Sequence, residues 1–470
     1  MEFEKLTLFE LVEGIKQQKF TSEQVVKYFI KRVEEQKSLN AIIEVFDDVI
    51  EKAKVIDEKI KSGKPVGKLA GLPVAIKDNI AYKGKKLSCS SAFMQGYVSP
   101  YSATIVKKLE AEDAIIFGRT NMDEFAMGGS CEKSVYGPTK NAYNSQHVAG
   151  GSSGGSAVAV AAGLCPVAIG TDTGGSVRQP SSFNGVVGVK PTYGTVSRYG
   201  LVAFASSTDQ AGPITKTVEE CEFVLKIIAG KDELDQTSIQ NTFGSVKVKQ
   251  KYTIGIIKQL KDKISDLPSS ESFNKSVETL KGLGYEFVEV DVPHFLNSLA
   301  CYYILATAEA ASNLSRFDGL KYAVQSKDAK TLEDVYVKSR SEGFGTEVKH
   351  RIMLGNFVLS SGYYDAYYRK AQKLQSLLKK EFALAFEKCD AIITPTTPGE
   401  AFKIGEISDP VTMYLEDLFT VPPSITGLPG LSVPCGVGVS GLPLGLQLIG
   451  KEQSETVLFD IAKKFIKEGK

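Results

Sequence analysis

The sequence predicts an α/β fold built around a largely buried mixed β-sheet. Strand-like and helix-like segments alternate along the 470 residues, and no fixed-period repeat is present. Hydrophobic residues make up 43% of the chain and charged residues 24%, a composition typical of a globular protein with a packed core. Two or more domains are the neutral expectation for this length, because single cores rarely grow beyond about 300 residues, although one large α/β domain is compatible with it.

The N-terminal part, about residues 1–65, is predicted to be helical. Thr21 and Gln24 form a capping-box pattern, and apolar residues recur after them at helical spacing, which predicts an amphipathic helix. A second helix is predicted from the apolar positions between residues 49 and 60, and Gly63 is expected to end it.

The middle of the chain, about residues 66–230, is predicted to form the core of the fold. It contains a compact apolar strand at residues 72–76, which carries Lys77 at its end. Residues 149–212 are rich in Gly, Ser, Ala and Thr, but the apolar segments among them exclude a flexible linker. The charged and polar segment at about 231–251 shows little periodicity, and we predict that it connects the two halves of the fold.

The C-terminal half, about residues 252–470, is predicted to begin with a βαβ-like unit. A strand at 253–257 precedes a helical pattern, and an alternating strand around Val290 follows. A long amphipathic helix, with its apolar stripe between residues 371 and 385, leads into a short strand at 391–393.

The charge balance excludes a protein that holds nucleic acid by its own broad electrostatic field. The chain has 56 basic and 55 acidic residues and a formal net charge of +1. Any RNA contact must therefore be local or shared with a partner.

The cysteines and the apolar runs indicate the compartment. The seven cysteines are scattered, odd in number and without a CxxC pair, so we expect neither a disulfide framework nor a zinc site, and a reducing cytoplasm fits best. The start of the sequence lacks the features of a signal peptide. The longest apolar run, residues 157–169, is interrupted by Gly163 and Pro166 and is shorter than the roughly 18 residues of a membrane span, so no membrane segment is expected.

Three short segments contain residue types that could carry chemistry: residues 74–79 around Lys77, the loop 150–156, and residues 170–180. Each alone has a simpler explanation, because a Gly/Ser loop before an apolar helix is often a turn or a phosphate cradle, and a strand-end lysine is often a surface residue. The phosphate cradle is disfavoured, since the sequence has no GxxxxGK[ST] and no lysine follows the glycines. Burial at the end of an apolar strand would lower the pKa of Lys77 by disfavouring its charged form.

Together the three segments resemble the centre of the amidase signature family, in which a lysine, a bridging serine and a nucleophilic serine act together. Matched motif to motif, the lysine corresponds to Lys77, the bridging serine to Ser152 and the nucleophile to Ser176, with no gap between the two serines. The resemblance implies the amidase signature fold, a large mixed central β-sheet covered by helices on both faces, in a single domain across residues 1–470 with its catalytic core at about 66–230.

The resemblance also implies a mechanism. A serine hydroxyl is a poor nucleophile until a base takes its proton, and a neutral Lys77 would draw the proton of Ser176 through Ser152. Water would then hydrolyse the acyl-enzyme. The family's oxyanion hole corresponds to the backbone N–H groups of Thr173, Gly174, Gly175 and Ser176. No cofactor and no metal are implied for this chain.

Other hydrolase classes fit poorly. None of the three histidines, His147, His294 and His350, lies in a nucleophile or metal motif, and no GxSxG elbow surrounds Ser176, so an ordinary Ser-His-Asp hydrolase is disfavoured. No cysteine lies in a recognisable thiol-glutaminase context.

Within that family, the chain is similar to the glutamine-hydrolysing subunits of tRNA-dependent amidotransferases. The runs that carry this similarity, and that other amidases rarely share, are residues 117–130, 190–194, 198–207 and 360–368. The implied substrate is free glutamine, whose carboxylate needs a cation and whose ammonium needs an anion. The corresponding positions are Arg351 for the cation and Asp417 for the anion, with Tyr302 and Gly128 lining the site. A surface ion or a packed tyrosine is the alternative explanation of these residues.

The same similarity implies partners. Ammonia would pass to a partner subunit that activates a misacylated tRNA with ATP and Mg²⁺, within a heterotrimer that contains two further subunits, B and C. The near-neutral charge agrees with tRNA being held mainly by the partners. The choice between Glu-tRNA(Gln), Asp-tRNA(Asn) or both as acceptor is left open. Two further hypotheses are a free-standing amidase for small amides and a non-enzymatic module that binds an anion through its Gly/Ser loops.

Overall fold

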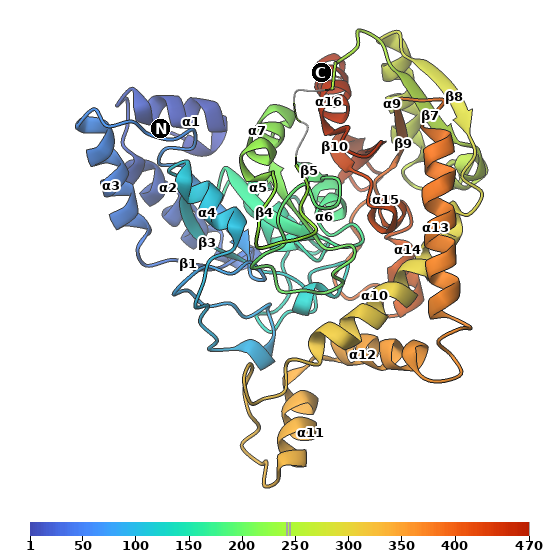
Figure 1. The fold of residues 1–470 in the computed structure, drawn as a ribbon. Helices are drawn as coiled ribbons and strands as arrows, with labels where there is room; N and C mark the ends of the chain where they lie inside the picture. The colour runs from blue at the N-terminus through green and yellow to red at the C-terminus, as the bar shows by residue number, and fades with distance from the viewer. Residues whose placement is uncertain (241–242, 244–245, 470) are drawn as a thin grey trace.

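A single mixed β-sheet runs through the molecule (Figure 1). The computed structural model describes residues 1–240, 243 and 246–469. Within them, eleven strands are ordered β1-β3-β2-β4-β6-β5-β10-β11-β9-β7-β8. The strands are β1 (Ile42–Val45), β2 (Pro73–Lys77), β3 (Ile115–Thr120), β4 (Val167–Asp172), β5 (Val187–Lys190), β6 (Gln210–Thr215), β7 (Thr253–Ile257), β8 (Glu286–Val290), β9 (Ala391–Pro395), β10 (Gly430–Val437) and β11 (Pro443–Gly450).

The strand directions confirm the prediction of a mixed sheet. On one side of the sheet β2 runs parallel to β3 and β4, and on the other β7 runs parallel to β8 and β9. The strands between these groups, from β4 through β6, β5, β10 and β11 to β9, pair antiparallel, as does the edge strand β1 with β3.

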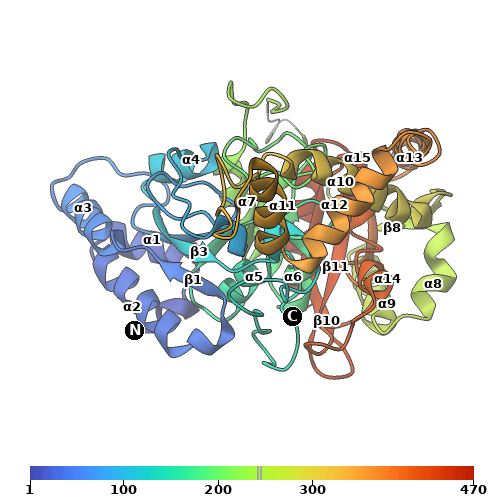
Figure 2. The same ribbon diagram turned by 90° about the horizontal axis from the view of Figure 1, so that it is seen from below.

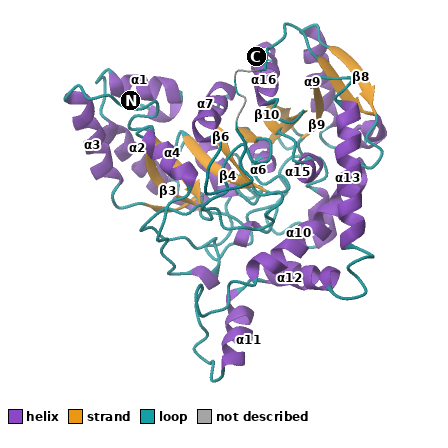
Figure 3. Cartoon of the chain, viewed as in Figure 1, coloured by secondary structure: helices purple, strands orange, loops and turns teal. Residues whose placement is uncertain are grey.

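Helices surround this sheet and connect its strands (Figure 3). The α-helices are α1 (Leu8–Lys16), α2 (Ser22–Glu35), α3 (Val49–Lys61), α4 (Thr104–Ala111), α5 (Gly154–Ala161), α6 (Arg178–Phe183), α7 (Val218–Ile228), α8 (Lys261–Ser265), α9 (Ser270–Gly282), α10 (Ser298–Leu314), α11 (Leu332–Gly343), α12 (Thr346–Leu359), α13 (Tyr368–Ala385), α14 (Pro410–Leu415), α15 (Val421–Thr426) and α16 (Glu455–Glu468). The short 3₁₀ turns are η1 (Phe3–Lys5), η2 (Lys37–Leu39), η3 (Ala92–Met94), η4 (Glu124–Ala126), η5 (Lys258–Leu260) and η6 (Phe295–Asn297).

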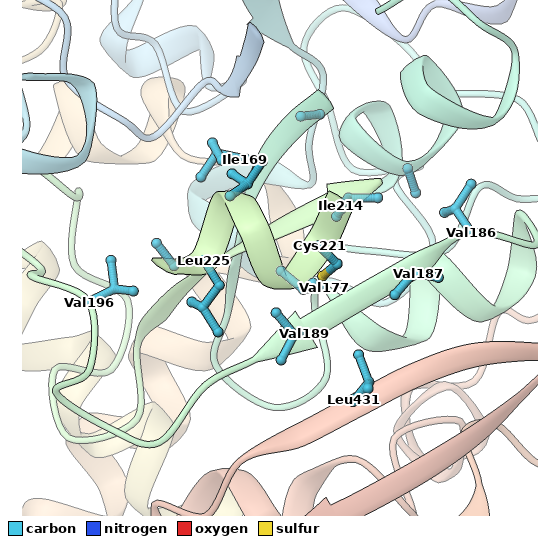
Figure 4. Packing of buried hydrophobic residues seen from close by; sticks show 14 of the residues in the cluster. Ile169, Val177, Val186, Val187, Val189, Val196, Ile214, Cys221, Leu225 and Leu431 are labelled. Atoms are coloured by element: carbon cyan, nitrogen blue, oxygen red, sulfur yellow. The ribbon is translucent and has the colours of Figure 1, made fainter. Parts of the chain in front are cut away.

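Strand β5 shows that both faces of the sheet are covered. Successive side chains of a strand point to opposite faces, so Gly188 and its neighbour Val187 face different layers. A Cβ built on Gly188 would overlap the side chain of Ser181 in α6. Val187, in contrast, lines a cleft together with Val218 of α7. Figure 4 shows Cys221 and Leu225 of α7 in the buried cluster, and α7 packs against β5 and β6 on this second side.

The N-terminal part is largely helical, as predicted. The capping box at α2 is present, since the Thr21 hydroxyl accepts the N–H of Gln24 and the Gln24 side chain accepts the N–H of Thr21. Helix α3 ends at Lys61, and Gly63 follows with φ at 67°. The prediction missed β1, because its four half-buried residues form an edge strand without alternation between apolar and polar positions.

The βαβ unit predicted at the start of the C-terminal half is confirmed, since β7 and β8 are parallel and α9 connects them. The long helix is α13, and the strand after it, β9, extends to Pro395. The polar connection predicted at 231–251 includes residues 241, 242, 244 and 245, which lie outside the described residues. The division of the chain into one domain stays a prediction.

Helices α10, α11 and α12 were not predicted. In Figures 1 and 3, α10 and α12 lie together below the strands, and α11 projects beyond them. The view from below in Figure 2 places α10 and α12 across the strands near α15. These helices matter because two of the residues expected in the substrate site lie on them.

The described part of the chain has no helix that combines the length and the hydropathy of a bilayer span. All seven cysteines are free thiols, and all but Cys435 are buried. No group of His, Cys, Asp and Glu among the residues with described positions is arranged to hold a metal ion.

Candidate active site

Lys77 is the last residue of β2 and is fully buried. Its Nζ lies 2.7 Å from Ser152 Oγ, 2.9 Å from Ser153 Oγ and 3.3 Å from the carbonyl oxygen of Thr171. The Ser153 hydroxyl itself donates to the Thr171 carbonyl at 3.0 Å, so Ser153 accepts from Lys77. A neutral amine has two N–H donors and one lone pair. With Ser153 and Thr171 accepting the two N–H groups, the lone pair is left for the proton of Ser152.

Burial places the titration of Lys77 near neutral pH. Loss of hydration lowers the pKa of Lys77 to about 7, against the opposing effect of the carboxylates of Asp123 and Asp172. A large share of Lys77 is therefore neutral at physiological pH and able to act as a base.

Ser152 lies in the loop before α5, and its peptide bond with Gly151 is cis. The Gly151 N–H donates to Gln179 Oε1 at 2.8 Å, and the Asp123 N–H donates to the Ser152 carbonyl at 3.3 Å. A Cβ on Gly151 would overlap the Asp123 carboxylate. Gln179 and Asp123, which the sequence analysis did not single out, therefore hold Ser152 in place.

Ser176 lies in the turn between β4 and α6. The Ser153 N–H donates to the Ser176 carbonyl at 3.1 Å, which joins the two serine loops. Ser176 is 8% exposed, whereas Lys77 and Ser152 are 0% exposed, so Ser176 is the member of the triad that reaches the surface. Its hydroxyl makes no hydrogen bond to any residue of the described ranges. The contact between Lys77 and Ser152 is therefore the part of the expected proton relay that is formed.

A buried ion pair fixes the turn that carries Ser176. Asp172 binds Arg178 through both carboxylate oxygens, at 2.9 and 3.0 Å, and accepts the N–H groups of Gly175 and Val177 at 2.8 and 3.1 Å. Burial alone would raise the pKa of Asp172, but the Arg178 guanidinium and these donors hold it below its usual value. The Asp172 carboxylate therefore stays ionised and holds the turn through these hydrogen bonds.

The same turn presents backbone donors for an oxyanion. The Gly175 N–H is already bound to Asp172, which differs from the family-based expectation for this residue. The N–H groups of Thr173, Gly174 and Ser176 bind no acceptor among the described residues. A Cβ on Gly174 would lie 2.6 Å from the ring of Tyr302, so only glycine lets the backbone approach that ring.

Tyr302 and Asp417 reach this turn from separate elements. Tyr302, on α10, covers Gly174. Asp417 belongs to a turn whose Thr420 hydroxyl donates to the Gly174 carbonyl at 2.7 Å, and the Thr420 N–H donates to the Asp417 carbonyl at 3.2 Å. Burial raises the pKa of Asp417 to about 7, while the hydroxyl of Tyr303, 3.1 Å from its carboxylate, opposes that rise.

Arg351, on α12, lies in an aromatic cage. Its Nε donates to Glu347 Oε1 at 2.8 Å. Its guanidinium carbon lies 5.4 to 5.6 Å from the centres of three rings, those of Phe204, Tyr303 and Tyr414. Its two terminal nitrogens make no hydrogen bond to the described part of the chain, so a planar donor pair is available for a ligand carboxylate.

Gly128 lies beside the Ser152 loop. A Cβ on Gly128 would overlap the Asp123 carboxylate, and the carbonyl of the next residue, Gly129, accepts Gln179 Nε2 at 2.7 Å. Gly128, Tyr302 and Asp417 thus lie beside the turns of Ser152 and Ser176. Arg351 is connected to them through Tyr303, whose ring lies beside its guanidinium and whose hydroxyl binds Asp417.

Comparison with known proteins gives one family. The model of the Amidase family matches residues 24–459. The A subunit of the glutamyl-tRNA(Gln) amidotransferase of Caldanaerobacter subterraneus subsp. tengcongensis is 47% identical, with 99% of this chain and 97% of that protein aligned. The protein of the same name from Bacillus velezensis is 51% identical over 88% of this chain and 86% of its own length.

Solved structures of similar proteins have the same fold as this chain. The crystal structure of the A subunit of the glutamyl-tRNA(Gln) amidotransferase from Thermotoga maritima superposes with a TM-score of 0.80 at 39% identity, covering 99% of this chain and 95% of that one. The peptide amidase of Stenotrophomonas maltophilia superposes with a TM-score of 0.82 at 28% identity, covering 99% and 97%.

Proposed function

The chain belongs to the amidase family, and on this basis we propose that it is the glutaminase subunit of a glutamyl-tRNA(Gln) amidotransferase, a carbon–nitrogen ligase with glutamine as amido donor. The observation that carries the chemistry is the buried Lys77, 2.7 Å from Ser152 and next to the turn of Ser176. The relatives' shared name, over nearly the full length of the chain, supports glutamine as the substrate.

In the proposed reaction, Ser176 Oγ attacks the side-chain amide carbon of glutamine. The hydroxyl proton moves to Ser152 Oγ as the proton of Ser152 moves to the lone pair of Lys77. The N–H groups of Thr173, Gly174 and Ser176 stabilise the oxyanion, and one such donor contributes roughly 3 kcal/mol.

The intermediate then collapses. The proton held by Lys77 returns through Ser152 to the leaving nitrogen, and ammonia departs from a γ-glutamyl ester on Ser176. A water molecule, deprotonated along the same path, attacks the ester and releases glutamate with the Ser176 hydroxyl restored.

The two charged groups of glutamine are assigned to residues near the turn that carries Ser176. In this proposal the terminal nitrogens of Arg351 bind the α-carboxylate of glutamine and the Asp417 carboxylate binds its ammonium, which would lower the pKa of Asp417 below the value of about 7 that burial gives it. Tyr302 and Gly128 form walls of the same site. Their closeness to Gly174 and to the Ser152 loop supports this assignment.

The remaining steps are assigned to partners. Ammonia passes to a heterotrimer partner, one of two further subunits, B and C, which activates the carboxylate of misacylated Glu-tRNA(Gln) with ATP and Mg²⁺. The net charge of +1 supports tRNA being bound mainly by those partners. The free thiols support a cytoplasmic location for the complex.

The test is glutaminase activity of the chain co-expressed with two candidate partner subunits, with and without Ser176→Ala. The parent complex is expected to release glutamate, faster with ATP and acceptor tRNA, and the Ser176→Ala complex is expected to assemble but release none. Near-parental activity of Ser176→Ala would refute the nucleophile. Rapid turnover of varied small amides by the isolated chain, without glutaminase activity, would favour the free-standing amidase instead.

A further inference from the structure

A buried carboxylate outside the proton path joins two parts of the site. Asp209 is 6% exposed and lies just before β6. Its Oδ1 accepts the Thr173 hydroxyl at 2.7 Å and the Ala205 N–H at 3.2 Å, and its Oδ2 accepts the Phe204 N–H at 2.8 Å.

The contacts with Thr173 and Phe204 connect Asp209 to the two parts of the site that are proposed to bind the amide and the α-carboxylate of glutamine. Thr173 begins the turn that offers oxyanion donors, and its own N–H is one of them. Phe204 is 2% exposed, and its ring centre lies 5.5 Å from the guanidinium carbon of Arg351. One side chain therefore connects the place where the amide is attacked to the wall behind the cation for the α-carboxylate.

We propose that Asp209 is a positioning residue that fixes the distance between the oxyanion donors and Arg351, and thereby selects an amino-acid amide of the length of glutamine. The inference rests on the proposed function, because it uses glutamine as the substrate. Asparagine is one methylene shorter, so its amide carbon and its carboxylate would fit the two ends less well, and its kcat/KM is expected to be lower than that of glutamine.

The carboxylate, rather than an amide, is required by the hydrogen bonds. Both oxygens of Asp209 accept from separate segments, whereas an asparagine has one accepting oxygen and an NH₂ group that would face a donor. Burial raises the pKa of Asp209 to about 6, so the side chain remains an anion in an assay at about pH 7.5.

The two contacts can be broken one at a time. Thr173→Val keeps the shape of the side chain and removes only the hydroxyl, so kcat is expected to fall about tenfold or more with KM unchanged, because loss of a positioned oxyanion donor lowers kcat by roughly 10² to 10³. Phe204→Leu removes the ring beside Arg351, and KM is expected to rise by about fivefold to thirtyfold, since a desolvated cation–π contact is worth roughly 1 to 2 kcal/mol. Asp209→Asn is expected to change both parameters.

The experiment measures kcat and KM for glutamine and for asparagine with the assembled complex of parent and variants. For Asp209→Asn, the ratio of kcat/KM between glutamine and asparagine is expected to fall by at least fivefold. The matched control is Glu220→Gln, because Glu220 is also a buried carboxylate, 2% exposed, that accepts two N–H groups, from Leu8 at 2.7 Å and Thr217 at 3.0 Å, but lies away from the catalytic turns. Glu220→Gln should lower the melting temperature without changing either kinetic parameter.

The outcomes separate the two proposals. A parent complex without glutaminase activity refutes the proposed function itself. With an active parent, an Asp209→Asn variant that loses thermal stability but keeps the parental kcat, KM and substrate ratio refutes the positioning role. If Asp209→Asn does not fold, Thr173→Val and Phe204→Leu decide, and parental kcat in the first together with parental KM in the second overturns the inference.

Discussion

Replacing Lys77 by methionine should stabilise the fold at neutral pH while abolishing glutaminase activity. The ammonium of a lysine in the unfolded chain titrates near 10.5, and burial in the folded protein lowers the pKa of Lys77 to about 7. Between these values the unfolded state binds more protons than the folded state, so the stability of the parent rises with pH. Methionine has no proton to lose, and its advantage is therefore largest below pH 7 and disappears toward pH 10.5.

The size of the effect follows from the shift. At about 1.4 kcal/mol for each pKa unit, the buried amine destabilises the parent by roughly 5 kcal/mol at pH 6, about 4 kcal/mol at pH 7.5 and about 2 kcal/mol at pH 9. Methionine also leaves Ser152 and Ser153 without the nitrogen that they contact, a loss of about 1 to 3 kcal/mol that does not depend on pH. The difference in unfolding free energy between variant and parent should therefore shrink by about 3 kcal/mol from pH 6 to pH 9.

The assay is urea unfolding of the parent and of Lys77→Met at several pH values, followed by circular dichroism. Lys190→Met is the matched control, because burial also lowers the pKa of Lys190 to about 7, although its Nζ donates within the described residues only to the carbonyl of Pro191 and takes no part in the proposed triad. This control should show the same pH-dependent stabilisation and keep most of the glutaminase activity. A stability difference for Lys77→Met that stays constant from pH 6 to pH 9 would refute a folded-state pKa near 7 and, with it, a neutral lysine as base.

Three further predictions concern the site. Arg351→Lys should raise KM for glutamine by roughly tenfold to a hundredfold with a smaller change in kcat, since a point charge replaces a planar donor pair; an unchanged KM would remove Arg351 from the site. Gly174→Ala should lower kcat/KM and the melting temperature, because its Cβ would lie 2.6 Å from the ring of Tyr302; parental kinetics would contradict that contact. The acid limb of the pH profile of kcat/KM is expected near pH 7 in the parent, and Asp123→Asn should move it to lower pH, because the Asp123 carboxylate favours protonated Lys77; a shift to higher pH would reverse the assigned sign.

Local sequence patterns predicted the parts of the fold that depend on local physics. A helix or strand requires a characteristic spacing of residues within its own segment, and this spacing can be read from the sequence. Examples are the capping box of Thr21 and Gln24, the apolar strand before Lys77 and the βαβ unit that begins at Thr253. Ser152 and Ser176 could also be assigned from the sequence, because both lie in glycine-rich motifs of one continuous segment that resembles the amidase signature family.

The residues around the proposed triad could not be predicted from local sequence patterns. Tyr302, Arg351 and Asp417 come from three separate elements and meet only when the chain folds, so no spacing connects them, and the family resemblance alone indicated them. Asp172 and Asp209 accept backbone donors from turns whose geometry no periodicity reveals. A buried acid close to the nucleophile in sequence, as Asp172 is to Ser176, is a signal that could have been used.

The most direct test of the whole account is the identity of the residue that becomes acylated. The assembled complex is incubated with a glutamine analogue that carries an electrophilic group at the amide carbon, and the adduct is located by mass spectrometry of peptides. The account predicts one adduct per chain, on Ser176, that is absent from Ser176→Ala and forms more slowly as the pH falls below 7. An adduct on a cysteine, or on another serine with Ser176 unmodified, would contradict it.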